Sequence, residues 1–150
     1  MLEGCRVRIA SNKDLEKIFE IEKKTFKEDA WSKEIILAEL NNKEGQESFL
    51  VEKNNELVAY LMINIFQLEY HIINFAVSKL YQNNGIGKML LKFFLDKIPN
   101  KSFVFLEVKQ INFKAINLYE GVGFTKQYIR DNYYSDGASA VILSYSKIRS

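Results

Sequence analysis

The sequence predicts a single-domain α/β fold, with a mixed, mostly antiparallel central sheet of about seven strands flanked by about four helices. Three observations predict this fold class. The chain has 150 residues, of which 47% are hydrophobic and 27% charged, as in one globular domain spanning residues 1–150. Three strand-like segments follow one another between residues 48 and 77. Helix-like and strand-like segments alternate after them, which indicates one parallel strand pairing.

The N-terminal part of the chain predicts one strand and two helices. Residues 5–9 form a short strand-like segment. The tetrapeptide Ser11-Asn12-Lys13-Asp14 fits a capping box, which satisfies free amides at a helix start, and predicts a helix to about Thr25. The hydroxyl of Ser32 predicts the cap of a second helix, which ends near Leu40.

The middle of the chain predicts three antiparallel strands in succession. Residues 48–52, 57–66 and 68–77 are rich in aliphatic and aromatic side chains. The turn-like Lys53-Asn54-Asn55 separates the first two segments, and a brief polar break near Gln67 separates the last two. Such short connections favour antiparallel neighbours.

The most regular helical pattern follows Gly85. Apolar residues recur at i, i+3, i+4, i+7 and i+8 from Ile86, and Pro99 ends the pattern. Residues 103–108 then form a nearly continuous apolar strand that a single acid, Glu107, interrupts.

One more helix and two strands complete the expected fold. Asn112 predicts the cap of a helix that Gly121 and Gly123 terminate. Residues 124–130 and 138–146 predict two closing strands.

Composition excludes several functional classes. The net charge of +2 is far from the strong field of a dedicated nucleic-acid binder, so no direct nucleic-acid partner is expected. Cys5 and His71 are the sole cysteine and histidine, so neither a disulfide nor a Cys/His zinc cluster is expected. Arg6 and Arg8 stand where a signal peptide needs an apolar run, and the apolar runs are too short to cross a bilayer. We expect a cytoplasmic protein without a metal or a membrane partner.

Residues 77–88 carry the most informative motif, because they leave a strand and open the strongest helix. Gly85 and Gly87 let the backbone approach a ligand, and Lys88 adds a positive charge. Free amides and the positive end of the helix dipole favour a pyrophosphate there. Leu90 stands where a dinucleotide fingerprint has its third glycine, and the loop is not a Walker loop. An anionic cofactor is one interpretation, and a plain strand-to-helix turn is the other.

The pattern Val77-x4-Gln82-x2-Gly85-x-Gly87 resembles the coenzyme A pyrophosphate motif of the GNAT superfamily of N-acetyltransferases. Further segments resemble the RimI-type ribosomal-protein alanine N-acetyltransferases in order and spacing. These segments are Ala30-Trp31-Ser32, residues 74–77, Leu106-Glu107-Val108, Asn112, residues 115–120, Gly123-Phe124 and residues 129–134.

The resemblance implies acetyl-CoA as cosubstrate. The backbone of Phe75, Ala76 and Val77 would run beside the pantetheine arm, and Asn112 would also touch the cofactor. The pyrophosphate would lie against Gln82, Asn83, Asn84, Gly85, Ile86, Gly87 and Lys88. Glu107 matches the family's general base, and Tyr119 matches the acid that protonates the departing thiolate.

The chemistry suits a carboxylate base. A free α-amine has a pKa near 8 and a lysine near 10.4, so a modest base suffices for a protein N-terminus. We expect burial in an apolar strand to raise the pKa of Glu107, unless the carboxylate pairs with a lysine or caps an amide. His71 is an alternative base or simply a partly exposed strand residue, and regular alternation places it on one face with Glu69, Ile73 and Phe75.

The resemblance implies transfer of an acetyl group to the N-terminal α-amine of a protein, in particular an alanine-starting ribosomal protein of the small subunit. Acetylation of a lysine or of a small amine, and a non-catalytic CoA-binding module, stay open as alternatives. Tyr133 and Tyr134 either line a peptide groove or cover an edge of the core, and Trp31 either walls the acceptor site or anchors the first helices.

Overall fold

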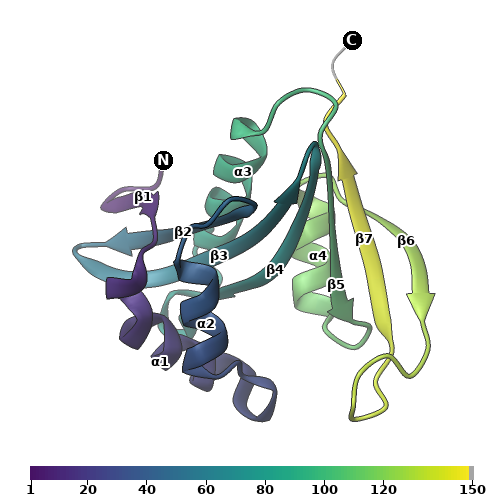
Figure 1. The fold of residues 1–150 in the computed structure, drawn as a ribbon, viewed down its shortest axis with the longest axis horizontal. Helices are drawn as coiled ribbons and strands as arrows, with labels where there is room; N and C mark the ends of the chain where they lie inside the picture. Colours follow the sequence, from purple (N-terminus) through teal and green to yellow (C-terminus); the bar gives the residue numbers. More distant parts are fainter. Residues whose placement is uncertain (149–150) are drawn as a thin grey trace.

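The computed structural model describes residues 1–148 and contains one seven-stranded sheet (Figure 1). The strands follow the order β1-β2-β3-β4-β5-β7-β6. Only β4 and β5 pair in parallel among these neighbours. The strands are β1 (Cys5–Ile9), β2 (Gln46–Lys53), β3 (Glu56–Phe66), β4 (Glu69–Val77), β5 (Phe103–Lys109), β6 (Thr125–Arg130) and β7 (Ala140–Ser146). The expected mixed, mostly antiparallel sheet is confirmed.

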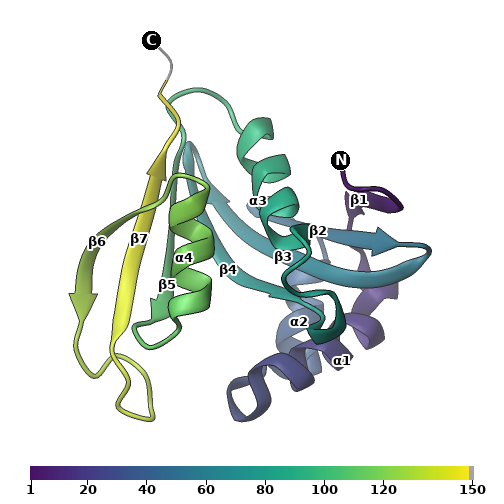
Figure 2. The ribbon, with the colours of Figure 1, turned by 180° about the vertical axis from the view of Figure 1, so that it is seen from behind.

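Helices cover both faces of this sheet. The α-helices are α1 (Leu15–Phe26), α2 (Lys33–Leu40), α3 (Ile86–Lys97) and α4 (Phe113–Gly121). Figure 1 shows α1 and α2 on the near face, and Figure 2 shows α3 and α4 on the opposite face. Short 3-10 turns occupy Asn12–Asp14, Lys27–Asp29 and Lys79–Tyr81.

The predicted helix caps are present. Ser11 and Asp14 form the capping box, in which the backbone N–H of Ser11 donates to the Asp14 carboxylate at 2.9 Å. The Ser32 hydroxyl accepts the N–H of Ile35. These caps satisfy amides that would otherwise lack partners, so the helix starts were predictable from local sequence.

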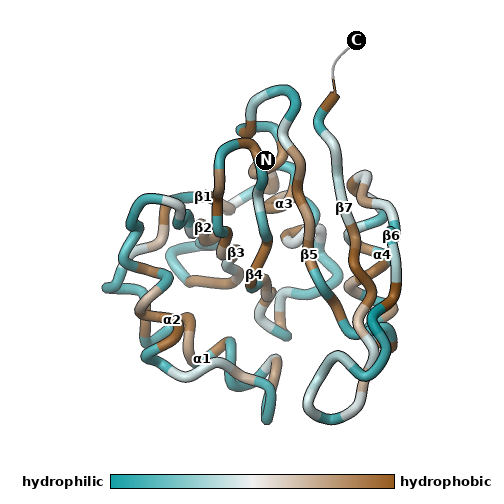
Figure 3. The backbone as a smooth tube through the Cα atoms, turned by 45° about the vertical axis from the view of Figure 1, so that its right-hand side comes forward, coloured by the Kyte–Doolittle hydropathy of each residue, from teal (hydrophilic) through white to brown (hydrophobic). Residues whose placement is uncertain are grey.

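The core has two layers, one on each side of the sheet. Leu61 and Ile63 of β3 pack in the cluster under α3 and α4, whereas Tyr60 and Met62 pack in the cluster under α1 and α2. Figure 3 shows hydrophobic residues along the central strands and hydrophilic ones in the connecting loops. A central strand covered on both faces explains the nearly continuous apolar run of β3.

A β-bulge in β4 changes which side chains share a face. Ile73 is an extra residue, because Met62 and Ile63 of β3 pair with its neighbours on either side. Phe75 therefore packs toward α3 and α4, whereas His71 contacts Glu107 on the opposite side of the sheet. The predicted common face of His71 and Phe75 is wrong, because that prediction assumed uninterrupted alternation.

A cleft lies between β4 and β5, because residues of both strands line one pocket. These strands pair only over Glu69–His71 and Phe103–Phe105, at the end where both begin. Beyond the pairing they diverge, as Figure 1 shows. The bulge follows the last paired residue, and bulges bend a strand and increase its twist. The sheet therefore has two halves that are joined by backbone bonds at only one end.

Candidate active site

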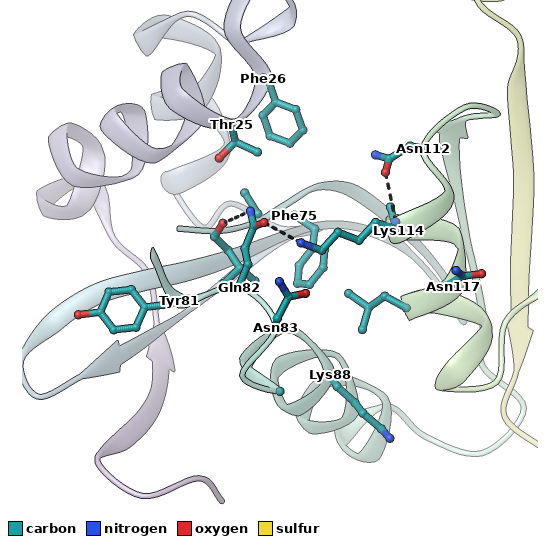
Figure 4. A pocket seen from close by; sticks show the side chains of 16 residues that line it. Thr25, Phe26, Phe75, Tyr81, Gln82, Asn83, Lys88, Asn112, Lys114 and Asn117 are labelled. Atoms are coloured by element: carbon teal, nitrogen blue, oxygen red, sulfur yellow. Dashed lines mark hydrogen bonds between the residues drawn. The ribbon is translucent and has the colours of Figure 1, made fainter. Parts of the chain in front are cut away.

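A pocket of about 430 Å³ lies between β4, the loop before α3 and helix α4 (Figure 4). It is lined by most of the residues expected to bind the cofactor: Phe75, Ala76, Val77, Gln82, Asn83, Gly85, Gly87, Lys88 and Asn112. Two expected residues are not among its lining. The side chain of Ile86 is buried in the core, and Asn84 is exposed outside the pocket.

Gly85 and Gly87 of this loop are each required for a different structural reason. Gly85 precedes α3 with a left-handed φ of +81°, which costs glycine little. A Cβ on Gly87 would lie 3.2 Å from the ring of Phe75 and 3.3 Å from Leu118 and Val77. The missing side chain of Gly87 thus allows α3 to pack against the lining of the pocket, a reason that the sequence interpretation did not include.

A side-chain link spans this first pocket. Gln82 donates from Nε2 to the carbonyl of Val77 at 3.0 Å, and its Oε1 accepts from Lys114 Nζ at 2.9 Å (Figure 4). Lys114 adds a second cation to Lys88 among the lining residues. Lys114 was not among the residues expected from the sequence, although it lies in the first turn of the helix that Asn112 caps, where a lysine can face an anionic ligand.

A second pocket, also of about 430 Å³, continues the cleft toward α1 and the β6–β7 loop. Glu107 and Tyr119 both belong to its lining. It shares four lining residues with the first pocket, namely Phe26, Phe75, Asn112 and Ala115. The two pockets therefore meet inside the cleft, and the second of them contains an acidic residue and a tyrosine in its lining.

Glu107 forms a pair with His71. Nε2 of His71 lies 2.7 Å from Oε2 of Glu107, and the imidazole stacks on Phe105 with ring centres 4.4 Å apart. The hydrogen bond from His71 holds the pKa of Glu107 below its usual range and outweighs the opposing effect of burial. The expected rise in this pKa is wrong, because the sequence did not reveal a partner from the neighbouring strand.

Tyr119 is almost fully buried, with 6% of its surface exposed. Its ring packs against Phe75 and Phe124, with ring centres 5.9 Å and 5.6 Å away. Burial raises the pKa of its phenol, so the hydroxyl stays protonated at neutral pH and is able to donate.

Glu22 is a further acidic residue of the second pocket and was not among the residues expected from the sequence. Glu22 is 1% exposed, and its carboxylate accepts hydrogen bonds from the Tyr60 hydroxyl, from Asn74 Nδ2 at 2.8 Å and from the Trp31 N–H at 2.9 Å. The sequence position of Glu22 could have indicated its burial, since an acid at i+4 from Ile18 lies on the apolar face of the helix.

The three aromatic residues considered for the acceptor site lie in different places. Trp31 and Tyr134 line the second pocket, whereas Tyr133 is not part of its lining and is 44% exposed. Within residues 1–148 no three His, Cys, Asp or Glu side chains gather in a metal-binding group. None of the helices described here has the length and apolar character needed to span a membrane.

Residues 13–124 match the acetyltransferase (GNAT) family, so the chain belongs to this family and is an N-acetyltransferase. Its relatives include the ribosomal protein bS18-alanine N-acetyltransferase of Escherichia coli K12, which is 32% identical over 117 residues covering 75% of this chain and 78% of the relative. The crystal structure of the ribosomal-protein-S18-alanine N-acetyltransferase from Escherichia coli matches with a TM-score of 0.87 at 27% identity, covering 97% of this chain and 96% of that chain. The family and fold expected from the sequence are confirmed.

Arabidopsis thaliana NAA60 in complex with acetyl-CoA shares the fold, with a TM-score of 0.83 at 17% identity over 95% of this chain and 99% of that chain. The GNAT fold uses acetyl-CoA. The first pocket suits such a molecule, because it combines helix N-terminal amides and two lysines with an apolar floor that includes Phe75, Val77 and Leu118.

Proposed function

We propose that this protein transfers acetyl from acetyl-CoA to the N-terminal amine of a protein, in particular an alanine-starting small-subunit ribosomal protein. The observation that carries the proposal is the meeting of two pockets, the second of which is lined by Glu107 and Tyr119. The names and sequence similarity of the Escherichia coli relatives support the acceptor class. Residues 1–150 act as one catalytic domain in this proposal.

The residues of the cleft take separate roles in this proposal. The loop from Gln82 to Lys88 and Asn112 hold the cofactor, so the thioester lies at the junction of the two pockets. Glu107 accepts the proton that the amine loses as its nitrogen bonds to the acetyl carbon, directly or through one water. Tyr119 donates a hydrogen bond or its proton to the sulfur as the carbon–sulfur bond breaks. The products are an N-acetylated chain and CoA.

The state of Glu107 favours an N-terminal amine over a lysine. Hydrogen bonding to His71 lowers the pKa of Glu107 and makes it a weak base. At pH 7.5, deprotonating an α-amine costs less than about 1 kcal/mol, whereas deprotonating a lysine costs about 4 kcal/mol. A weak base is therefore adequate for the first acceptor and poorly matched to the second.

The test is mass spectrometry of an alanine-starting ribosomal peptide that contains one internal lysine, after incubation with acetyl-CoA. Fragmentation locates the added acetyl group. Acetylation of the terminal amine supports the proposal, and acetylation of the lysine overturns the acceptor assignment. Absence of product, with CoA binding established by calorimetry, indicates a small-amine acceptor or a non-catalytic CoA-binding module.

A further inference from the structure

We propose that Lys109 is a specificity-determining residue of the acceptor site, because it ties together the two loops that face each other at the open end of the cleft. The inference rests on the proposed function, since it concerns how the second pocket holds a peptide. Lys109 is the last residue of β5 and lines that pocket.

The geometry of the tie is specific. Nζ of Lys109 lies 2.8 Å from Oδ2 of Asp29 and 2.7 Å from Oδ2 of Asp136, and 5.5 Å from the ring centre of Tyr134. Asp29 ends the 3-10 turn between α1 and α2, and Asp136 belongs to the β6–β7 loop. One ammonium group therefore connects three segments of the chain.

The ion pair between Lys109 and Asp29 lies where no backbone pairing holds the two halves of the sheet together. Backbone pairing joins the two halves of the sheet only over Glu69–His71 and Phe103–Phe105. Asp29 belongs to the half with α1, and Asp136 to the half with β6 and β7. At the unpaired end of the cleft, the pair between Lys109 and Asp29 joins these halves on the acceptor side. Its loss leaves this side free to widen.

The Asp136 partner is itself held in place. Its Oδ1 accepts the N–H of Ala138 at 2.9 Å, and the N–H of Gly137 donates to the carbonyl of Tyr134 at 2.9 Å. The β6–β7 loop is thus a tight turn that presents Asp136 and Tyr134 together. Lys109 then holds this turn at a fixed distance from the turn that carries Asp29.

The distance from Glu107 to Lys109 along β5 indicates which residue of an acceptor peptide lies beside Lys109. Lys109 lies two residues beyond Glu107 on the same face of the strand, which is about 7 Å toward the open end. An extended acceptor with its amine at Glu107 reaches Lys109 with about its second or third residue. A one-residue acceptor such as alaninamide ends before Lys109.

The test compares Lys109→Met, which keeps the alkyl stem, with Lys126→Met, an exposed residue of β6 that has the same charge change and lies outside both pockets. Each exposed ion pair contributes little by itself. Because Lys109→Met removes the pairs with Asp29 and Asp136 together, we expect the KM for an alanine-starting tetrapeptide to rise about tenfold. The acetyl-CoA KM, the kcat and the alaninamide kcat/KM change less than about twofold. Asp136→Asn, which removes one pair, gives a smaller rise in the same direction.

Trp31 supplies a readout that does not need activity. It is the single tryptophan of the chain, lies two residues after Asp29 and lines the second pocket. We expect Lys109→Met, but not Lys126→Met, to increase acrylamide quenching of its fluorescence about twofold. Unchanged quenching, or equal effects on tetrapeptide and alaninamide, overturns the inference. A wild-type protein that acetylates no peptide refutes the proposed function instead, and quenching still decides whether the tie exists.

Discussion

Replacing Tyr60 by phenylalanine removes one donor from the buried carboxylate of Glu22 and leaves the ring in place. Tyr60 is fully buried in the cluster under α1 and α2, and its hydroxyl is one of three donors to Glu22. A hydrogen bond to a charged group contributes about 1.5–3 kcal/mol. We therefore expect Tyr60→Phe to lower the free energy of unfolding by about 2 kcal/mol. For a domain of this size, that loss lowers Tm by about 4–8 °C.

The assay is urea denaturation, with a double-mutant cycle between Tyr60→Phe and Glu22→Gln. With a neutral glutamine acceptor the same hydroxyl is worth only about 0.5–1.5 kcal/mol, so the two substitutions couple by about 1 kcal/mol. Tyr145→Phe is the matched control, because that half-buried ring packs on Phe124 and we expect a change below about 0.5 kcal/mol. An equal cost of Tyr60→Phe in both backgrounds refutes the reasoning.

Three further predictions concern the helix starts and the first pocket. Burial raises the pKa of Asp14, but hydrogen bonds from Arg8 outweigh this effect and hold the pKa below its usual range. The free energy of unfolding therefore falls as the pH drops below about 4. Asp14→Asn flattens that slope in urea titrations from pH 2 to 6. Ser32→Ala removes the cap of α2 and costs about 1 kcal/mol in the same assay, whereas an unchanged midpoint contradicts the cap. Gly87→Trp forces an indole among the three side chains that already face this position, so the acetyl-CoA Kd measured by calorimetry rises at least about tenfold. An unaltered Kd in a folded variant rules out this placement of the cofactor.

Features encoded by local sequence were predictable. The capping box at Ser11 and the cap at Ser32 bind amides within three residues, so their signals lie in one short stretch. The apolar period after Gly85 and the stop near Pro99 similarly predicted α3. The same loop predicted five lining residues of the first pocket, because they lie in one short stretch: Gln82, Asn83, Gly85, Gly87 and Lys88.

Features that depend on distant partners were not predictable. The position of the bulge at Ile73 depends on the register between β3 and β4, and no turn or glycine marks that position in the sequence. His71 and Glu107 are 36 residues apart, so nothing local indicated that two candidate bases form one pair. The ion pair of Lys109 and Asp29 spans 80 residues and joins side chains from the two halves of the sheet.

Glu107 as the proton acceptor is the central claim, and it is tested most directly by kcat/KM for an alanine-starting peptide from pH 6 to 9.5. Because the pKa of Glu107 is held below its usual range, the carboxylate is ionised throughout and the rate follows the amine, reaching half its maximum near pH 8 and a plateau above about pH 9. We expect Glu107→Gln to lower the plateau by at least about 100-fold, with the acetyl-CoA Kd unchanged. A plateau within about threefold of the wild type contradicts the assignment.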